Sequence, residues 1–354
     1  MIKQNRRRFI KTMTALPAAV AIKGFFSLNW LSSPLSANNP HIMPAANNKY
    51  TPGYLELHRN GELKIRGEIL HEKMRSCTLC PRNCETDRLS GQRGDCKANA
   101  DLEISSFSPH FGEERELVGR NGSGTIFFTN CSLLCVFCIN YEISHLGEGR
   151  RQSVRRLADM MLFLQRQGCH NINVVTPSHY LPHIILALDR AASQGLTLPL
   201  VYNTCGWEKP DILDFLDGVV DIYLADYKYA NTTAANTYSS GAACYPETTQ
   251  QALLKMHKQV GVAKPDPSTG LINKGLMIRH LVMPENVVRS DLVMRWIASN
   301  LPADTYVNIM SQYTPMYKAF DYPEISRSIT RSEYNNVVSI ARQAGLTNLR
   351  LQMR

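Results

Sequence analysis

The fold is decided by the stretch Thr125-Ile126-Phe127-Phe128-Thr129-Asn130-Cys131-Ser132-Leu133-Leu134-Cys135-Val136-Phe137-Cys138. Its first four residues are β-branched or aromatic, a composition that favours a strand. Three cysteines follow directly after this predicted strand. In parallel α/β sheets, functional side chains lie just beyond the carboxyl ends of the strands. We therefore predict that the cysteine loop lies at the functional edge of a sheet.

Downstream of this stretch, short β-branched runs alternate with amphipathic segments. Further strands are predicted at 171–175, 198–202, 219–225, 276–282, 306–310 and 346–351, and helices at 154–167, 180–192, 211–216, 246–260, 290–300 and 332–344. Alternation with short connections implies parallel strands joined by right-handed crossovers. We therefore predict an α/β fold, a partial (β/α)6 barrel of about six strands.

Polar side chains follow several of these predicted strands, where a parallel architecture places function. They include Thr176-Pro177-Ser178-His179, Asn203-Thr204, Asp226-Tyr227-Lys228, Arg279-His280 and Ser311-Gln312. Ser178, His179, Asn203, Thr204, Asp226, Lys228 and His280 are therefore candidate site residues. For Lys228 the alternative is an ordinary ion pair with Asp226, and for the histidines it is a structural role.

The spacing of Cys131, Cys135 and Cys138 predicts a 4Fe-4S cluster. Gaps of three and two residues between the cysteines let one loop place thiolates on three corners of a cubane. Three protein ligands leave one iron open to a substrate. The apolar spacers Leu133, Leu134, Val136 and Phe137 would shield the cluster from water.

Three other interpretations fit this loop less well. A structural zinc ion needs four ligands, and the loop has three. A ferredoxin loop has two-residue gaps throughout and a fourth cysteine followed by proline. Disulfide pairing leaves one of the three cysteines over. An open cluster is therefore the preferred prediction.

This loop resembles that of the radical S-adenosylmethionine superfamily, which carries the same three cysteines and an aromatic residue, here Phe137, before the last. The resemblance implies that the open iron binds the amino and carboxylate groups of S-adenosylmethionine. One electron then cleaves the bond from sulfur to the 5' carbon, and the 5'-deoxyadenosyl radical abstracts hydrogen from a substrate. It also implies a low-potential electron donor of the flavodoxin or ferredoxin type.

The likeness is closest to proteins similar to pyruvate formate-lyase activating enzyme, a glycyl-radical activase, and extends from Cys77 to the end of the chain. It implies that Phe137, Asn140 and the residues after the strands bind the cofactor, with Asp226, Lys228 and His280 near S-adenosylmethionine or the peptide. The matching stretches are Cys77-Thr78-Leu79-Cys80-Pro81-Arg82-Asn83-Cys84, Phe111-Gly112-Glu113-Glu114, Gly124-Thr125-Ile126-Phe127-Phe128, Cys138-Ile139-Asn140-Tyr141-Glu142, Asn203-Thr204, Asp226-Tyr227-Lys228 and Arg279-His280-Leu281-Val282-Met283-Pro284.

The sequence departs from the activases after the second predicted strand. There the activases carry Gly-Gly-Glu, which receives the methionine amino group, and this chain has Thr176-Pro177-Ser178-His179. The substrate therefore does not follow from the resemblance. We expect an activase of a glycyl-radical enzyme, and the alternatives are radical modification of a small molecule or peptide, or a non-enzymatic electron carrier.

A second cysteine group consists of Cys77, Cys80, Cys84 and Cys96. Four thiols in twenty residues, interrupted by glycines and a proline, indicate a metal site, either a structural zinc or a second iron-sulfur cluster. Disulfide pairing is the alternative if the protein is exported. We assign residues 55–115 to a small N-terminal Cys-rich module and residues 116–354 to the main domain.

The first residues of the chain have the pattern of a targeting segment. Asn5-Arg6-Arg7-Arg8-Phe9-Ile10-Lys11 resembles a twin-arginine signal, and the apolar stretch after it is too short to span a bilayer. We predict a signal segment at 1–37 and a linker at 38–54, with a basic tail or an uncleaved anchor as the alternatives. Export conflicts with the need for S-adenosylmethionine and a reductant, which are cytoplasmic, so the localisation stays open.

The net charge of +9 does not predict nucleic-acid binding. Six of the basic residues precede Ala37 without any acidic residue among them, which leaves +3 for the remainder of the chain. A charge of that size is ordinary for a domain of this length. We therefore expect neither a nucleic-acid partner nor a stable membrane span.

Overall fold

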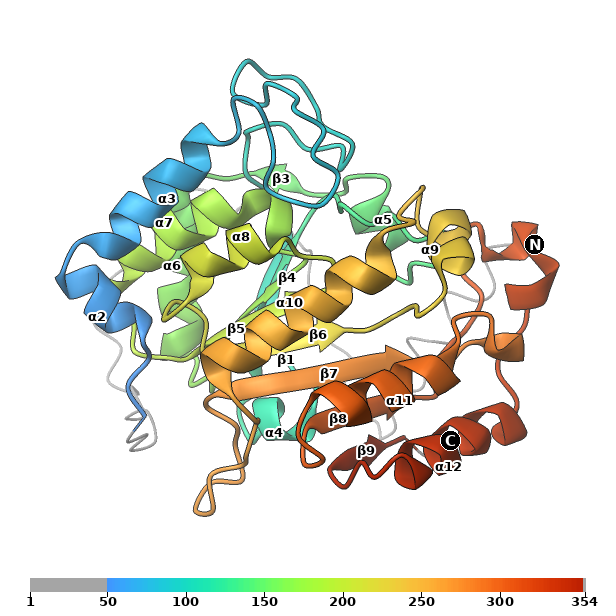
Figure 1. Ribbon diagram of the computed structural model, residues 1–354. Helices are drawn as coiled ribbons and strands as arrows, with labels where there is room; N and C mark the ends of the chain where they lie inside the picture. The colour runs from blue at the N-terminus through green and yellow to red at the C-terminus, as the bar shows by residue number, and fades with distance from the viewer. Residues whose placement is uncertain (1–49, 353–354) are drawn as a thin grey trace, which may run out of the picture. The chain divides into compact units, whose positions relative to one another are not determined.

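A mixed sheet of nine strands organises the chain in the computed structural model, which describes residues 50–352 (Figure 1). The strand order is β3-β1-β2-β4-β5-β6-β7-β8-β9. The strands are β1 (Glu103–His110), β2 (Ser123–Phe128), β3 (Arg150–Arg151), β4 (Ile172–Val175), β5 (Leu200–Thr204), β6 (Ile222–Asp226), β7 (Gly275–Leu281), β8 (Tyr306–Met310) and β9 (Leu349–Leu351). The predicted signal segment, and the linker up to residue 49, lie outside the described residues.

The run from β2 through β4, β5, β6, β7 and β8 to β9 is parallel throughout. Every strand predicted from the alternation is present, with boundaries displaced by a few residues. The run includes β9 and is therefore slightly longer than the six strands of the predicted barrel. The two outer strands of the whole nine-stranded sheet, β3 and β9, are not paired with each other, so the sheet is open.

The antiparallel part of the sheet was not predicted. β1 pairs antiparallel with β2, and β3 pairs antiparallel with β1. The sequence of β1, Glu-Ile-Ser-Ser-Phe-Ser-Pro-His, is rich in polar residues and has a register shift between Ile104 and Ser106. It therefore lacks the apolar period that identifies the other strands.

The strand register gives the two faces of the sheet different chemistry. Residues that pair across parallel strands point to the same side, so Asp226, Arg279 and Asn308 share one face. By the same register Asn173 and Asn203 belong to this face, which we call the polar face. The opposite face carries Val174, Tyr202, Ala225 and Ile278, all part of the main hydrophobic core.

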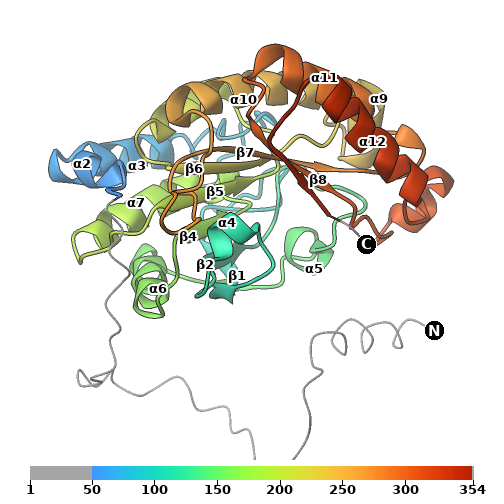
Figure 2. The ribbon, with the colours of Figure 1, turned by 90° about the horizontal axis from the view of Figure 1, so that it is seen from below.

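Helices cover the apolar face, as Figure 2 shows. The long ones are α6 (Val154–Arg166), α7 (Leu181–Ala192), α10 (Tyr245–Val260), α11 (Ser290–Asn300) and α12 (Arg331–Gln343). α6 starts at Ser153, whose hydroxyl accepts a hydrogen bond from the Arg156 amide, and α12 starts at a capping box of Thr330 and Glu333. Their buried apolar stripes complete the main core.

Two N-terminal helices, α2 (Tyr54–Arg59) and α3 (Glu62–Glu72), were not predicted. α3 packs against α7. The two helices approach closely at Gly67, where a Cβ atom would lie only 2.8 Å from the side chain of Leu186. This contact between segments distant in the sequence, rather than a strong local pattern, places α3.

Short elements complete the fold. They are α4 (Arg115–Val118), α5 (Tyr141–Ser144), α8 (Pro210–Leu213), α9 (Thr232–Tyr238) and the 3-10 turns Ser178–Tyr180, Asp214–Leu216, Pro284–Asn286, Ala319–Asp321 and Pro323–Ile325. α4 lies against the polar side of the sheet, where Leu117 packs with Val201 and Ile222 in a second apolar cluster. This cluster closes the amino-terminal end of the polar face.

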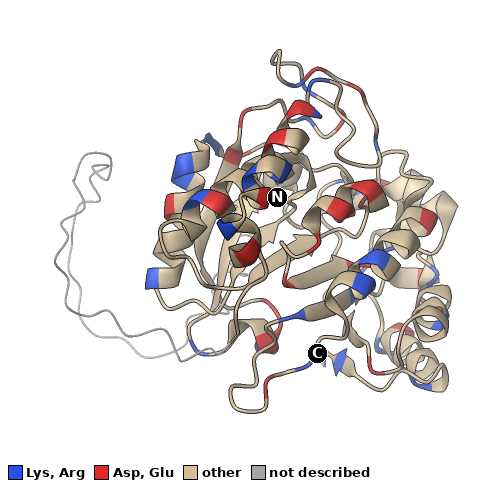
Figure 3. Ribbon diagram, turned by 60° about the vertical axis from the view of Figure 1, so that its left-hand side comes forward, with Lys and Arg blue, Asp and Glu red and all other residues tan. Residues whose placement is uncertain are grey.

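Charged residues of both signs are interspersed over the helices in the view of Figure 3. Within residues 50–352, every helix is too short or too polar to traverse a bilayer.

Candidate active site

The cysteine loop leaves the carboxyl end of β2 through two residues with left-handed backbone. Asn130 has φ of 66°, and Leu134 has φ of 52°. Asparagine tolerates this region, whereas for leucine it costs about 1–2 kcal/mol. The surroundings therefore have to hold the loop in this shape, which is a frequent property of functional sites.

Each of the three cysteine sulfurs in the loop accepts a hydrogen bond. The amide of Leu133 donates to Cys131 Sγ at 3.4 Å, Ser239 Oγ donates to Cys135 Sγ at 3.1 Å, and Ser144 Oγ donates to Cys138 Sγ at 3.2 Å. Hydrogen bonds to sulfur favour the thiolate and influence the reduction potential of iron-sulfur clusters. The neighbours of the loop thus suit thiolate ligands.

Main-chain bonds from three distant segments hold the loop. The Cys131 amide donates to the Cys96 carbonyl at 3.4 Å, and the Val136 amide donates to the Tyr238 carbonyl at 2.9 Å. The Lys318 amide donates to the Val136 carbonyl at 3.0 Å. These bonds set the position of the sulfurs relative to the sheet.

Burial favours the neutral thiol at Cys131 and Cys135 when no cation accompanies them. Burial and the nearby Cys135 raise the pKa of Cys131 to about 12. Burial also raises the pKa of Cys135, and the positive charge of Lys228 opposes that rise. A thiolate at these positions therefore needs a positive partner such as a metal.

The loop offers three thiolate donors. A structural zinc needs four ligands, whereas a cubane with one open iron takes three protein thiolates. Within residues 50–352, no group of three or more His, Cys, Asp or Glu side chains is arranged to hold a metal ion. Leu133, Leu134 and Phe137 are buried around the loop, and Val136 is partly buried.

A polar network lies at the carboxyl ends of β5, β6 and β7, and Arg279 is its centre. Arg279 donates to Asn203 Oδ1 at 2.6 Å, to Asp226 Oδ1 at 2.8 Å and to Glu113 Oε2 at 3.2 Å. Lys228 Nζ donates to Asp226 Oδ2 at 2.6 Å. Of the predicted residues, Asn203, Asp226 and Lys228 are therefore brought together.

Glu113 and Arg279 were not among the predicted site residues. Glu113 comes from the segment between β1 and α4, which no periodicity places near the sheet edge. The position of Arg279 at the end of β7 is the signal that identifies it. Burial raises the pKa of Glu113, whereas Arg279 and Lys228 outweigh burial and lower the pKa of Asp226.

Several buried polar atoms beside this network have no hydrogen-bond partner. They are Oδ1 of Asn173, Oε2 of Glu114 and Oδ1 of Asn308. Orphaned buried polar atoms are rare in proteins. Since Asn173 and Asn308 lie on the polar face with Asn203, Asp226 and Arg279, this face suits a ligand rich in hydrogen-bonding groups.

Ser178 and Thr204 belong to a different cluster. Both hydroxyls donate to Glu208 Oε1 at 2.5 Å, and Glu208 is completely buried. Burial raises the pKa of Glu208 to about 7. Thr204 points to the apolar side of the sheet because its neighbour Asn203 points to the polar side. The two predicted residues therefore contact Glu208, which was missed, and not the network of Arg279.

The two predicted histidines are buried, and protein atoms engage them. His179 Nε2 lies 2.7 Å from the Thr129 carbonyl, just before the cysteine loop. His280 lies between the Tyr227 carbonyl, 2.6 Å from Nδ1, and Ser290 Oγ, 2.8 Å from Nε2. Burial lowers the pKa of His179 to about 3 and that of His280 to about 4, so both rings are neutral at pH 7.

Phe137 and Asn140 differ in their surroundings. The Phe137 ring packs edge-on against Tyr229 and Tyr313, so its contacts are with other aromatic side chains. Asn140 is exposed at the start of α5, where its carbonyl accepts the Ser144 amide.

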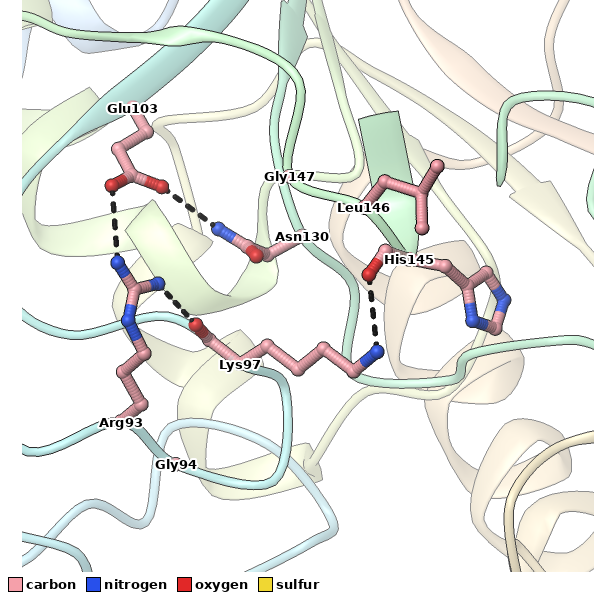
Figure 4. A pocket seen from close by; sticks show the side chains of 8 residues that line it. All are labelled: Arg93, Gly94, Lys97, Glu103, Asn130, His145, Leu146 and Gly147. Carbon is pink, nitrogen blue, oxygen red and sulfur yellow. Dashed lines mark hydrogen bonds and ion pairs between the residues drawn. The ribbon is translucent and has the colours of Figure 1, made fainter. Parts of the chain in front are cut away.

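A cavity of about 450 Å³ is lined by residues that neighbour Cys96 and by residues that flank the cysteine loop (Figure 4). Gly94 and Lys97 line it from the segment around Cys96, and Asn130 and His145 line it from the segments that flank the cysteine loop. Lys97 Nζ donates to the His145 carbonyl at 3.0 Å and so connects the two sides. The cavity brings solvent close to both groups.

No family model matches the chain. The chain is similar to an uncharacterized protein of Methanocaldococcus jannaschii, with 28% identity over 300 residues that cover 82% of each chain.

Proposed function

We propose that the chain is a radical S-adenosylmethionine enzyme, whose Cys131, Cys135 and Cys138 hold a 4Fe-4S cluster. When bound, the reduced cluster supplies one electron that cleaves S-adenosylmethionine and so generates a 5'-deoxyadenosyl radical for hydrogen abstraction. The open, mostly parallel sheet is then the partial barrel of this superfamily, and the electron comes from a flavodoxin- or ferredoxin-type donor.

One observation carries the proposal: the segment that follows β6 links the polar network with the cysteine loop. Lys228 donates to Asp226 Oδ2 at 2.6 Å, and its neighbour Tyr229 hydrogen-bonds Ser239, whose hydroxyl donates to Cys135 Sγ at 3.1 Å. A cluster on the loop and a polar ligand on the network would therefore be neighbours. A cofactor that is cleaved at the open iron of a cluster needs such a site beside the three thiolates.

The network has the groups that the methionyl part of S-adenosylmethionine requires. Arg279 and Lys228 offer positive charge to a carboxylate, and Asp226 and Glu113 offer negative charge to an amino group. Asn173 and Asn203 have amides for hydroxyl or ring nitrogen atoms. This set of side chains would take the place of the Gly-Gly-Glu stretch that the chain lacks.

The reaction proposed first is hydrogen abstraction from a backbone glycine of a partner protein, as in a glycyl-radical activase. Radical modification of a small molecule or a peptide is the second candidate. Its basis is the departure from the activases at Thr176-Pro177-Ser178-His179, which stands where they carry Gly-Gly-Glu.

Anaerobic reconstitution with iron, sulfide and a reductant tests the proposal. The protein should convert S-adenosylmethionine to 5'-deoxyadenosine and methionine, and Cys135→Ala should not. Cys244→Ala is the matched control because Cys244 is exposed and distant in sequence from both cysteine groups. An electron carrier would form neither product. Deuterium transfer from a labelled glycyl-radical enzyme or peptide would then separate the two candidate reactions.

A further inference from the structure

The cysteines of the second group lie close together in the structure. A Cβ atom at Gly94 would lie 3.0 Å from Cys84 Sγ and 3.8 Å from Cys96 Sγ, so the segment before Cys96 folds over Cys84. The Asn83 amide donates to the Cys80 carbonyl and the Glu85 amide to the Cys77 carbonyl, both at 3.1 Å, and the Cys84 thiol lies 3.9 Å from the Cys77 carbonyl, so the segment from Cys77 to Cys84 folds back on itself. All four cysteines are free, and only Cys84 is partly exposed.

A buried positive charge accompanies this group. Arg88 is completely buried, and its guanidinium donates to the Asn99 carbonyl at 2.7 Å and to Cys77 Sγ at 3.6 Å. Its Nε atom has no partner. In the part of the chain that the structure describes, no Asp or Glu forms an ion pair with Arg88. A buried charge without a counter-charge is strongly unfavourable.

Cys77 is the side-chain hydrogen-bond partner of the Arg88 guanidinium among residues 50–352, so negative charge on the cysteine group would balance Arg88. Neutral thiols and disulfides carry no charge, whereas four thiolates on a metal centre are negative overall. The buried guanidinium therefore indicates a metal–thiolate centre rather than disulfides.

Zinc and a 4Fe-4S cluster both accept four thiolates, so the ligands alone do not separate them. The contact of this group with the first cysteine loop favours the cluster.

The second group packs directly on the first. The Cys131 amide donates to the Cys96 carbonyl, so one hydrogen bond joins a cysteine of each group. Arg82, between Cys80 and Cys84, donates to the Ser132 carbonyl at 2.9 Å and to the Ser240 carbonyl at 2.5 Å. A zinc that only stabilised a distant module would need no such contact with the loop.

We propose that Cys77, Cys80, Cys84 and Cys96 hold a second 4Fe-4S cluster, which relays single electrons to the cluster of Cys131, Cys135 and Cys138. The relay rests on the proposed function. A low-potential one-electron donor reduces the second cluster from the 2+ to the 1+ state. That electron then passes to the first cluster and is consumed in the cleavage of the sulfur–carbon bond. The transfer between clusters forms and breaks no bond and moves no proton.

Metal analysis of the anaerobically purified full chain is the first test. Two clusters predict about eight irons and about eight sulfides per chain. The double variant Cys84→Ser/Cys96→Ser should keep about four of each, and Cys244→Ser should keep all of them. About four irons with one zinc, or about four irons and no other metal, would overturn the proposal.

Electron paramagnetic resonance tests the proximity. In the fully reduced wild-type protein, two adjacent paramagnetic clusters should broaden each other's signals, and the double variant should show one narrow signal. Two signals that do not interact would contradict a relay. The iron content and the resonance spectrum are both measured on the wild-type chain, so they test the second cluster even if the double variant folds poorly.

The choice of reductant tests the relay itself. Dithionite is small enough to reduce the first cluster directly, so the double variant should cleave S-adenosylmethionine at near the wild-type rate with dithionite. With a reduced ferredoxin or flavodoxin, its rate should fall by about tenfold or more. An equal rate with the protein donor would refute the relay.

These outcomes also separate the two proposals. About eight irons with interacting signals, but no cleavage of S-adenosylmethionine, would refute the proposed function and leave the second cluster standing. Cleavage of S-adenosylmethionine by a protein with only about four irons would support the proposed function and refute the second cluster.

Discussion

The main-chain amide of Cys131 donates to the main-chain carbonyl of Cys96 at 3.4 Å. These residues belong to two cysteine groups that the sequence separates into different segments. Because Arg82 also donates to the Ser132 carbonyl, the group of Cys77, Cys80, Cys84 and Cys96 supports the loop of Cys131 through side-chain and main-chain bonds. These contacts hold the two cysteine groups side by side.

Replacement of Arg88 should destabilise the metal-loaded protein and not the metal-free protein. Arg88→Met removes a buried positive charge that a thiolate centre would balance. The free energy of unfolding of the loaded protein should fall by about 3 kcal/mol, because the centre loses its counter-charge. That of the metal-free protein should not fall. Denaturant unfolding before and after anaerobic chelation measures both values, and an equal loss in the two forms would contradict a charge-balancing role.

Lys228→Met should weaken the binding of S-adenosylmethionine to the cluster-loaded protein. Lys228 donates to Asp226 in the polar network, and loss of a charged hydrogen bond worth about 1.5–3 kcal/mol raises Kd by about tenfold or more. Equilibrium dialysis measures this effect without catalysis. The control is Lys264→Met, in a side chain that is 72% exposed and paired with Asp304. An unchanged Kd in Lys228→Met would remove this residue from the cofactor site.

Glu208 should make the stability of the protein depend on pH. Its folded-state pKa of about 7 lies above its ordinary value of 4.5. The folded state therefore holds the proton more tightly, and this contribution is complete below about pH 4.5 and is lost as the pH rises through 7. Between pH 5.5 and 7.5, the wild type should lose about 2 kcal/mol of unfolding free energy relative to Glu208→Gln. A difference that stays constant with pH would show that Glu208 does not titrate in this range.

Gly206→Ala should disrupt the polar network at its base. Gly206 has φ of +80°, and a Cβ atom there would lie 1.9 Å from the main-chain oxygen of Asp226. The backbone of Asp226 would have to move, so we expect a loss of more than about 2 kcal/mol in unfolding free energy. Gly61→Ala is the matched control, since Gly61 has φ of +78° with no atom within 4 Å of the added carbon. It should cost only the backbone strain, about 1 kcal/mol.

Thr330→Ala should destabilise α12 and leave the site intact. Thr330 and Glu333 form a reciprocal capping box at the start of this helix. Its loss should cost about 1 kcal/mol, measured as a shift of the denaturation midpoint. The iron content should match that of the wild type. A fall in iron content would mean that the end of the helix is coupled to the cysteine loop.

The sequence by itself determined the local features of this protein. The period of apolar residues predicted the parallel strands and the long helices, and the cysteine spacing identified both groups as candidate metal sites. These features depend on neighbouring residues, so a single chain contains enough information. The polar β1 and the helices α2 and α3 were missed because tertiary contacts, rather than a local period, stabilise them.

Only the tertiary structure decided which candidates meet. Asn203 and Thr204 are adjacent in sequence, but they point to opposite faces, and a shift of one residue in the strand would exchange their roles. Sequence patterns locate strand ends only to within a few residues, so they could not separate the Arg279 network from the Glu208 cluster. The burial of Arg88 beside Cys77, and the contact of Cys96 with Cys131, arise from long-range packing that no local pattern encodes.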